Sequence, residues 1–112
     1  MFNYKFTVFT PSFNRADTLH RVFESLQIQS YRDFEWLIID DGSTDTTKSV
    51  VEEFKQSAHF PILYVYQNNT HKYVTLLRGA EMASGEFFYS VDSDDEILPN
   101  ALEVLHETWL TI

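Results

Sequence analysis

The chain has 112 residues, of which 44% are hydrophobic and 16% aromatic, enough for one domain with a single core. Its formal net charge of −9 argues against nucleic-acid binding through a broad basic surface, and the lack of cysteine excludes disulfides and thiolate metal sites. No apolar run approaches the ~20 residues of a membrane span and the N-terminus lacks a signal-peptide pattern. We therefore expect a cytoplasmic protein without a transmembrane segment in this chain, and leave membrane association through other sequence open.

The chain opens with a predicted strand and a predicted helix. Residues 6–10 form a short β-prone run, which Pro11 is expected to end. Apolar residues then recur at i, i+3, i+4 and i+7 over residues 19–26, and this spacing makes one face of a helix. Asp17 is the expected cap of that helix.

A second predicted strand and a second predicted helix follow. Residues 34–39 are almost continuously apolar, which is typical of a strand buried on both faces. The Gly-Ser-Thr-Asp turn at residues 42–45 ends this strand and supplies caps for a helix that carries Val50, Val51 and Phe54.

The third strand and helix follow the same plan. Residues 62–66 form an apolar run that is bounded by a proline on one side and an asparagine-rich loop on the other. Tyr73, Leu77 and Ala80 then mark a third helix, which is expected to end near Gly85.

The last strand and helix complete the alternation. Residues 87–91 form the fourth strand, and Pro99 suits the first turn of a helix whose apolar stripe is Leu102, Leu105 and Trp109. This helix continues to the end of the sequence without a stop signal, so we expect the chain to be part of a longer protein.

The predicted order is βαβαβαβα, without an internal repeat or a low-complexity segment. Such alternation favours parallel strands joined by right-handed crossovers. The expected fold is a doubly wound α/β domain with a mainly parallel, Rossmann-like sheet in a three-layer α/β/α arrangement.

Acidic residues cluster at the end of the fourth strand, in residues 91–95 (VDSDD). If this segment is extended, Asp92 and Asp94 point to the same side. Carboxylate oxygens at that spacing suit Mg²⁺ or Mn²⁺. The alternative is a solvated acidic turn that caps the following helix, and the cluster alone favours neither. An EF-hand is excluded because Ile97 stands where that loop requires glycine.

A second acidic pair, Asp40 and Asp41, follows the second strand. Asp-Gly is a common turn, but a carboxylate at a second strand exit would also accept hydrogen bonds from a nucleobase or a ribose hydroxyl. Ligands of open α/β sheets bind at the carboxyl ends of the strands, so two acidic exits favour a ligand site.

Other candidate residues follow the first and third strands. No glycine-rich phosphate loop is present, and residues 10–15 are either an ordinary turn or a wall that Pro11 and Phe13 form for a flat base. Lys72 is a candidate partner for a diphosphate or a base, whereas Arg78 is expected on an exposed helix face.

Three ordered motifs together closely resemble family 2 glycosyltransferases: residues 7–15 (TVFTPSFNR), 37–43 (LIIDDGS), and 91–95 with Pro99. The likeness covers essentially the whole chain. It implies a GT-A fold whose nucleotide-sugar-binding portion spans residues 1–112. It also implies transfer of a sugar, with inversion, from a nucleoside-diphosphate donor to a saccharide or lipid-linked acceptor in cell-envelope polysaccharide synthesis.

The resemblance also implies roles for individual residues. Asp41 would bind the nucleobase in a pocket lined by Pro11, and Asp92 would approach the ribose. Asp94 would be the metal ligand of a D-x-D motif, with Mn²⁺ or Mg²⁺ neutralising the departing diphosphate. Lys72 lies where the family often has a basic residue near the donor.

The family's catalytic base lies in a second, acceptor-binding half and has no match here, so we expect this chain alone to be inactive. A non-catalytic nucleotide-sugar-binding module is the main alternative. A phosphate-receiver domain is disfavoured because the first strand is not followed by an acidic pair and the third ends in Gln67-Asn68. An exposed sheet edge and an uncovered helix face would favour homo-oligomers.

Overall fold

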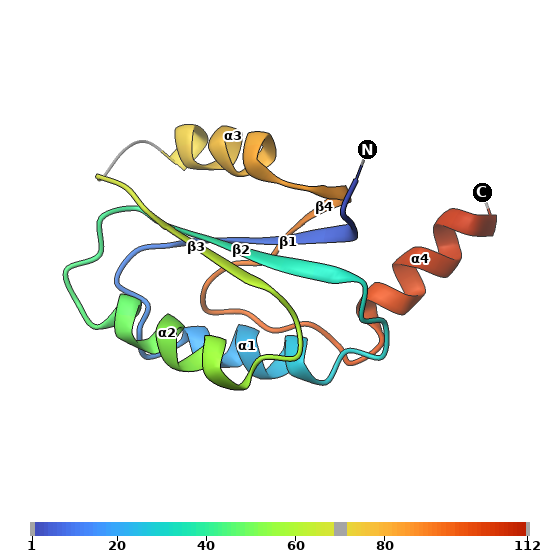
Figure 1. The fold of residues 1–112 in the computed structure, drawn as a ribbon, viewed down its shortest axis with the longest axis horizontal. Helices are drawn as coiled ribbons and strands as arrows, with labels where there is room; N and C mark the ends of the chain where they lie inside the picture. Colours follow the sequence, from blue (N-terminus) through green and yellow to red (C-terminus); the bar gives the residue numbers. More distant parts are fainter. Residues whose placement is uncertain (1, 69–71, 112) are drawn as a thin grey trace.

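The computed structural model describes residues 2–68 and 72–111, with the backbone alone at positions 72, 110 and 111. These residues form a strict alternation of strands and helices (Figure 1), which confirms the predicted order. The elements are β1 Tyr4–Ser12, α1 Leu19–Gln27, β2 Phe34–Asp40, α2 Thr47–Ser57, β3 Ile62–Tyr66, α3 Lys72–Met82, β4 Gly85–Ser90 and α4 Ala101–Thr111. None of the helices described is long and apolar enough to cross a membrane.

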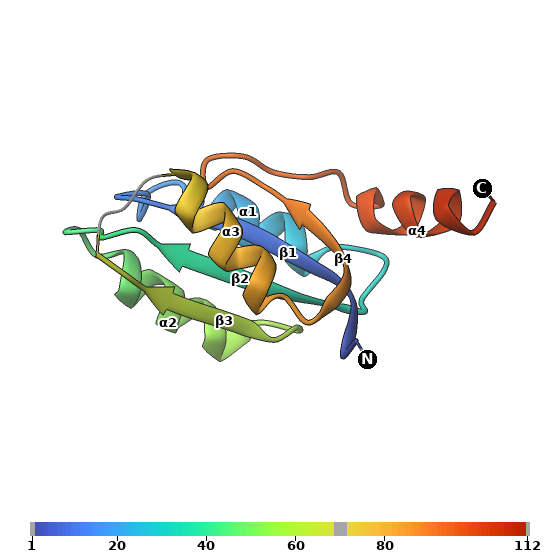
Figure 2. The same cartoon turned by 90° about the horizontal axis from the view of Figure 1, so that it is seen from above.

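The four strands pair in the order β3-β2-β1-β4, and every pairing is parallel. Val8 on the central strand β1 lies opposite Trp36 of β2 and Tyr89 of β4. Helices α1 and α2 cover one face of the sheet and α3 covers the other, whereas α4 extends beyond the β4 side (Figures 1 and 2). The doubly wound, three-layer α/β/α architecture is therefore confirmed.

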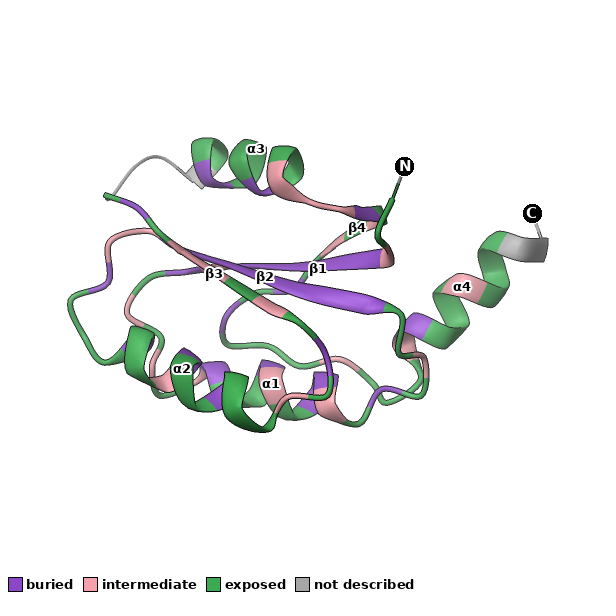
Figure 3. Ribbon diagram, in the orientation of Figure 1, coloured by how far each residue is buried: buried purple, intermediate pink, exposed green. Residues whose placement is uncertain are grey.

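The core lies on both faces of β2, in which every residue is buried (Figure 3). This matches the continuous apolar run that predicted a strand covered on both sides. On the α1 and α2 face, Trp36 donates a hydrogen bond from Nε1 to Thr10 Oγ1 at 2.9 Å, so its one polar atom is satisfied. The smaller cluster beneath α3 consists of Phe9, Leu37 and Ile39.

Pro11 does not end the first strand, as the sequence predicted, but lies within β1 opposite Ile39 of β2. The Phe9 carbonyl accepts a hydrogen bond from Val91 N–H at 2.8 Å, on the β4 side. Backbone groups two residues further along face the same side, so the missing N–H of Pro11 also faces β4. Pairing between β1 and β4 ends at Phe9 and Ser90, and β1 continues against β2 alone.

Two predicted boundaries shift for local reasons. Thr18, not Asp17, is the N-cap residue of α1, and no side-chain cap is formed there. The fourth strand begins at Gly85 rather than at Phe87 and stops before Val91. The glycine at position 85 is explained by the close approach of β1, because an added Cβ would clash with the backbone nitrogen of Thr7.

The buried face of α3 is not the one that its apolar residues indicated. Tyr73 and Leu77 are 70% and 64% exposed, and Ala80 is also exposed. Thr75 and Gly79 face the sheet instead. A Cβ on Gly79 would lie 2.5 Å from the Phe9 ring, so the glycine allows the helix backbone to approach the sheet closely.

Helix α4 uses only the beginning of its predicted apolar stripe. Leu102 is fully buried, whereas Leu105 and Trp109 are exposed at the surface. Trp109 makes an edge contact with Phe87 of β4, with ring centroids 5.0 Å apart. Pro99 precedes the helix in a turn rather than forming its first turn, because α4 begins at Ala101.

Candidate functional site

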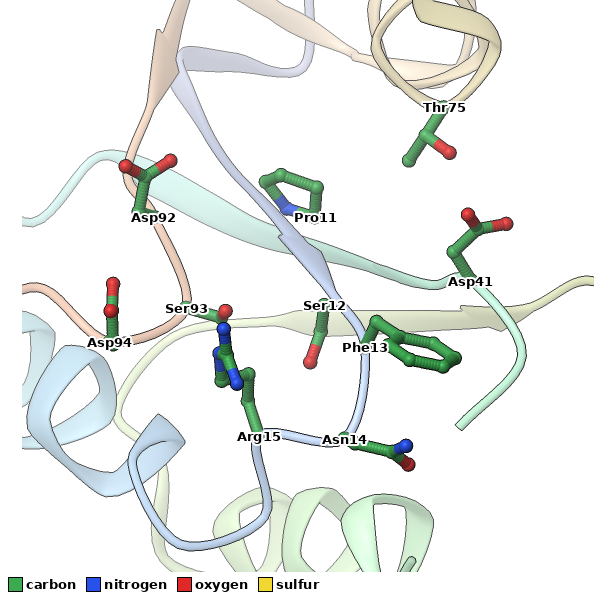
Figure 4. A pocket seen from close by; sticks show the side chains of 10 residues that line it. All are labelled: Pro11, Ser12, Phe13, Asn14, Arg15, Asp41, Thr75, Asp92, Ser93 and Asp94. Carbon is green, nitrogen blue, oxygen red and sulfur yellow. The ribbon is translucent and has the colours of Figure 1, made fainter. Parts of the chain in front are cut away.

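A hollow of about 620 Å³ lies at the sheet edge where the carboxyl ends of β1, β2 and β4 meet (Figure 4). It brings together the sequence-predicted residues Pro11, Phe13, Asp41, Asp92 and Asp94. Because β1 is central, Asp92 after β4 and Asp41 after β2 lie on opposite sides of Pro11. The other lining residues are Ser12, Asn14, Arg15, Thr75 and Ser93.

Lys72 is the first residue of α3, and its side chain lies outside the described part of the structure. The donor contact predicted for it therefore stays a prediction.

The loops that follow β1 and β2 are tied to each other. Asn14, which has a left-handed backbone conformation (φ 51°), donates from its backbone N–H to Ser43 Oγ at 2.7 Å. In return, Asn14 Oδ1 accepts from the backbone N–H of Thr44 at 2.8 Å. Gly42 has φ 92°, a conformation that only glycine adopts readily. The wall made by Pro11 and Phe13 is thus fixed relative to the Asp41 loop.

Asp45 extends the same connection to the start of α2. Its carboxylate accepts hydrogen bonds from the backbone N–H and the hydroxyl of Thr47 and from the backbone N–H of Ala16. Partial desolvation alone would raise the pKa of Asp45, but these hydrogen bonds outweigh it and lower the pKa below its usual value. The N-cap residue of α2 is Thr46, outside the turn predicted to supply the cap, and it forms no side-chain cap. Asp45, one residue earlier, bonds instead to Thr47, the first residue of the helix.

The neighbouring carboxylates Asp40 and Asp41 have different surroundings. Asp40 is buried, accepts from Ser43 N–H at 2.9 Å, and accepts from the Tyr64 hydroxyl. Burial and this hydrogen bond to Asp40 raise the pKa of Tyr64. Asp40 therefore stabilises the turn, whereas Asp41 lines the pocket. The family resemblance likewise assigns a site role to Asp41 and none to Asp40.

Asp41 is contacted by a side chain that the sequence did not single out as a site residue. Gln67, directly after β3, donates from Nε2 to Asp41 Oδ1 at 3.0 Å and to Thr75 Oγ1 at 3.1 Å. Arg78 lies on an exposed face of α3, as predicted, but its guanidinium donates to Gln67 Oε1 at 2.7 Å.

The acidic segment after β4 forms a turn. It is therefore not extended, contrary to the assumption that placed Asp92 and Asp94 on one side. Asp95 N–H donates to the Asp92 carbonyl at 3.1 Å. Asp92 and Asp94 nevertheless both line the pocket, and the Ser93 carbonyl between them accepts from Thr18 Oγ1 at 3.1 Å. The alternative role of this cluster as a cap for the next helix is wrong, because α4 begins only at Ala101.

The pocket residues fit a divalent cation that is shared with an anionic ligand. Within the described residues, no group of three or more His, Cys, Asp or Glu side chains is placed to hold a metal. Mg²⁺ sites need only one or two carboxylates and complete their shell with phosphate oxygens and water. Asp92 and Asp94 are exposed and supply two carboxylates for such a site.

Two further polar side chains line the pocket, one at the end of β1 and one in the loop that follows it. Ser12 is 3% exposed, and its Oγ is a buried side-chain atom without a hydrogen-bond partner in the described structure. Such an atom indicates a place where a ligand or a water molecule would bind. Arg15 extends its guanidinium toward Ser93 and Asp94 (Figure 4). Sequence reasoning assigned neither a role, although burial of Ser12 follows from its place in β1.

A parallel α/β sheet with polar side chains gathered at its carboxyl edge is typical of the open α/β folds that bind a ligand at that edge. The sequence matches the glycosyl transferase family 2 over residues 7–111. The chain belongs to this family.

Curated relatives are named as enzymes that transfer sugars. The chain is 37% identical over 106 residues to GalNAc(5)-diNAcBac-PP-undecaprenol beta-1,3-glucosyltransferase of Campylobacter jejuni, a match that covers 90% of this chain and 33% of the relative. It is 34% identical over 106 residues to the Staphylococcus aureus poly(ribitol-phosphate) beta-N-acetylglucosaminyltransferase TarP, covering 91% and 32%. The chain thus spans about a third of the length of these relatives.

Solved structures support the fold assignment. The crystal structure of S. aureus TarS residues 1–349 with UDP-GlcNAc superposes with a TM-score of 0.80 and 29% identity, covering 92% of this chain and 30% of that TarS chain. The mannosyltransferase PcManGT from Pyrobaculum calidifontis, solved with GDP-Man and Mn²⁺, gives a TM-score of 0.85 at 22% identity, covering 100% and 34%. The second likeness carries the fold alone. Both neighbours are glycosyltransferases, and the GT-A fold is confirmed.

Proposed function

We propose that the pocket binds a nucleoside-diphosphate sugar and that the chain is the donor-binding part of a glycosyltransferase. The observation that carries this proposal is the meeting of Asp41, Asp92 and Asp94, from two separate strand exits, at one pocket of about 620 Å³. Family membership supports it. TarS, which is similar over 92% of this chain, binds UDP and UDP-GlcNAc.

In this proposal the β1 and β2 side of the pocket binds the nucleobase. Pro11 and Phe13 form an apolar wall, and the Phe13 ring is exposed enough to contact a flat base. The Asp41 carboxylate accepts a hydrogen bond from a base N–H. This end is held rigid by the bonds between Asn14 and Ser43.

The β4 side binds the ribose and the diphosphate. Asp92 accepts hydrogen bonds from ribose hydroxyls, and Asp94 is the protein ligand of Mn²⁺ or Mg²⁺, while Lys72 approaches the diphosphate. The cation would neutralise negative charge that develops on the leaving diphosphate. Thr18, by its bond to the Ser93 carbonyl, keeps the turn that carries both carboxylates close to the β1 loop.

The complete enzyme would transfer the sugar with inversion, by direct attack of an acceptor hydroxyl on the anomeric carbon as the diphosphate leaves. We assign no residue of this chain as the base that accepts the hydroxyl proton. A saccharide or lipid-linked acceptor in cell-envelope synthesis is supported by the relatives' names, which include an undecaprenol-linked and a poly(ribitol-phosphate) substrate. A lipid-linked acceptor would bring the enzyme to a membrane surface.

Calorimetric titration of the chain with UDP, GDP, CDP and ADP, with and without Mn²⁺, tests the proposal. We expect one of these nucleotides to bind and Mn²⁺ to strengthen its binding. Asp94→Asn should abolish the strengthening, because an uncharged amide is a much weaker ligand for a hard cation.

Asp95→Asn is the matched control. Asp95 belongs to the same acidic cluster but does not line the pocket, and its carboxylate accepts from Glu96 N–H at 2.8 Å. It should keep the full effect of Mn²⁺. An equal loss in both variants would show that general negative charge, and not a specific ligand at Asp94, attracts the cation.

A further inference from the structure

Gln67 joins the candidate base-binding carboxylate to the rest of the fold. Its side chain is buried, with the residue 8% exposed, and its amide lies between Asp41 and Arg78. Its backbone is also fixed, because Gln67 N–H donates to the Asp40 carbonyl at 2.9 Å and so extends the pairing of β3 with β2. Gln67 therefore has little freedom in either backbone or side chain.

The orientation of the Gln67 amide follows from the chemistry of its neighbours. A guanidinium can only donate hydrogen bonds and an ionised carboxylate can only accept them. The carbonyl oxygen therefore faces Arg78 at 2.7 Å and the NH₂ group faces Asp41 at 3.0 Å. The second hydrogen of the NH₂ group is used by Thr75 Oγ1 at 3.1 Å. The opposite orientation would place the NH₂ group against a cation and the carbonyl against an anion.

The neutral amide of Gln67 between Arg78 and Asp41 differs in its effect from a direct ion pair between those two residues. If Arg78 bound Asp41 itself, the guanidinium would cover the carboxylate and compete with a ligand for it. The amide instead fixes the carboxylate through Oδ1 while the cation stays on the far side. The hydrogen bond from Gln67 thereby orients the Asp41 carboxylate.

We propose that Gln67 is a positioning residue for nucleobase recognition, which orients the Asp41 carboxylate toward the base and is itself anchored by Arg78. This inference rests on the proposed function, because it assumes that Asp41 contacts the base of a bound nucleotide. Gln67 itself is not a contact residue, since it is absent from the pocket lining. Replacing Gln67 should therefore weaken the contact with the base and leave the contacts with the diphosphate unchanged.

Gln67→Met tests the inference, since methionine has a similar length but cannot form these hydrogen bonds. In calorimetry with Mn²⁺, we expect about a tenfold loss of affinity for the tightest-binding of UDP, GDP, CDP and ADP. Affinity for inorganic pyrophosphate, which has no base, should stay within about twofold. An unchanged nucleotide affinity, or an equal loss for nucleotide and pyrophosphate, would contradict a role in base positioning.

Arg78→Leu provides a second route to the same answer if Gln67→Met does not fold, because Arg78 is exposed. It should cause a smaller loss than Gln67→Met, again only for the nucleotide. Arg21→Leu, an exposed arginine on α1 outside this pocket, is the control and should leave both affinities unchanged.

The proposed function and this inference fail in different ways. A wild-type chain that binds none of the four nucleotides would remove both. A wild-type chain that binds one of them, together with a Gln67→Met variant that binds it equally well, would remove only the role of Gln67.

Discussion

Side chains at this site either stabilise a turn or line the pocket. Neighbouring residues of the same type take different roles. Asp40 is buried and stabilises the turn after β2, while Asp41 lines the pocket. Asp94 likewise lines the pocket, while Asp95 bonds within its own turn. Both members of each pair are aspartates, so the direction in which each side chain points decides its role.

Asp45 gives a prediction at this scale. We expect Asp45→Asn to lower the free energy of unfolding by less than about 1 kcal/mol near neutral pH, because Asp45 is exposed and its hydrogen bonds are exposed or only partly buried. Its pKa is lowered in the folded chain, so the carboxylate stabilises the fold above its ordinary pKa of 3.8. This contribution is lost as the pH falls through the lower, folded value.

Urea unfolding of both proteins at about pH 6 and about pH 3 measures this difference. The gap between wild type and Asp45→Asn should be smaller at the acidic pH. Asp17→Asn, in the loop between β1 and α1, is the control and should show no gap at either pH. A gap for Asp45→Asn that widens on acidification would mean that the charged form does not stabilise the loop.

At the scale of helices and strands, α3 depends on close contact between a glycine and an aromatic ring. In Gly79→Ala the new Cβ would meet the Phe9 ring at 2.5 Å, and that ring is stacked on Phe88 with centroids 5.2 Å apart. We expect a net loss of stability, because overpacking costs about 1–3 kcal/mol. Removing a helical glycine recovers at most about 1 kcal/mol.

A double-variant cycle with Phe9→Leu checks the cause of this loss. Leucine removes the ring, so Gly79→Ala should cost less in the Phe9→Leu background than in the wild type when both are measured by urea unfolding. Glu81→Ala, on the exposed side of α3, should change stability by no more than about 0.5 kcal/mol. Equal costs of Gly79→Ala in both backgrounds would place the strain elsewhere.

Periodicity predicted the elements well and their buried faces less well. Residues 34–39 and 62–66 are strands almost as predicted, because continuous apolar runs between turn residues have few other solutions. On α3, however, Tyr73 and Leu77 are exposed and Gly79 faces the sheet. A glycine carries no hydrophobic signal, so a pattern of apolar residues cannot reveal a face that depends on close backbone approach.

Prediction of the site residues from the sequence has the same limit. Five of the six candidate binding residues lie together, because parallel strands bring their carboxyl ends to one edge and each motif follows a strand. The side chain of the sixth, Lys72, lies outside the described residues. Gln67 was missed as a site residue, since hydrogen bonds between separate strand exits leave no periodic trace in the sequence. Ser12 was missed because the first strand was predicted to end before it.

At the scale of the whole molecule, the net charge of −9 should oppose binding of an anionic nucleotide. Raising salt from about 0.01 M to about 0.15 M shortens the Debye length from about 30 Å to about 8 Å and screens this repulsion. We therefore expect the affinity for the best-binding nucleoside diphosphate, measured by calorimetry without divalent metal, to rise with salt.

The same titration with saturating Mn²⁺ is the comparison, because a bound cation offsets part of the local negative charge. The increase with salt should then be smaller. A metal-free affinity that falls with salt would instead mean that nearby cations such as Arg15 outweigh the net charge of the molecule.

The strand order also bears on how the pocket comes into being as the chain folds. The exits of β1 and β2 are separated by one helix, whereas Tyr4 of β1 pairs with Gly85 of β4, near the other end of the chain. Closing the longer loop costs more entropy, so β4 should dock after β1 and β2 have paired. The apolar wall and Asp41 would then assemble first, and the turn that carries Asp92 and Asp94 would complete the pocket last.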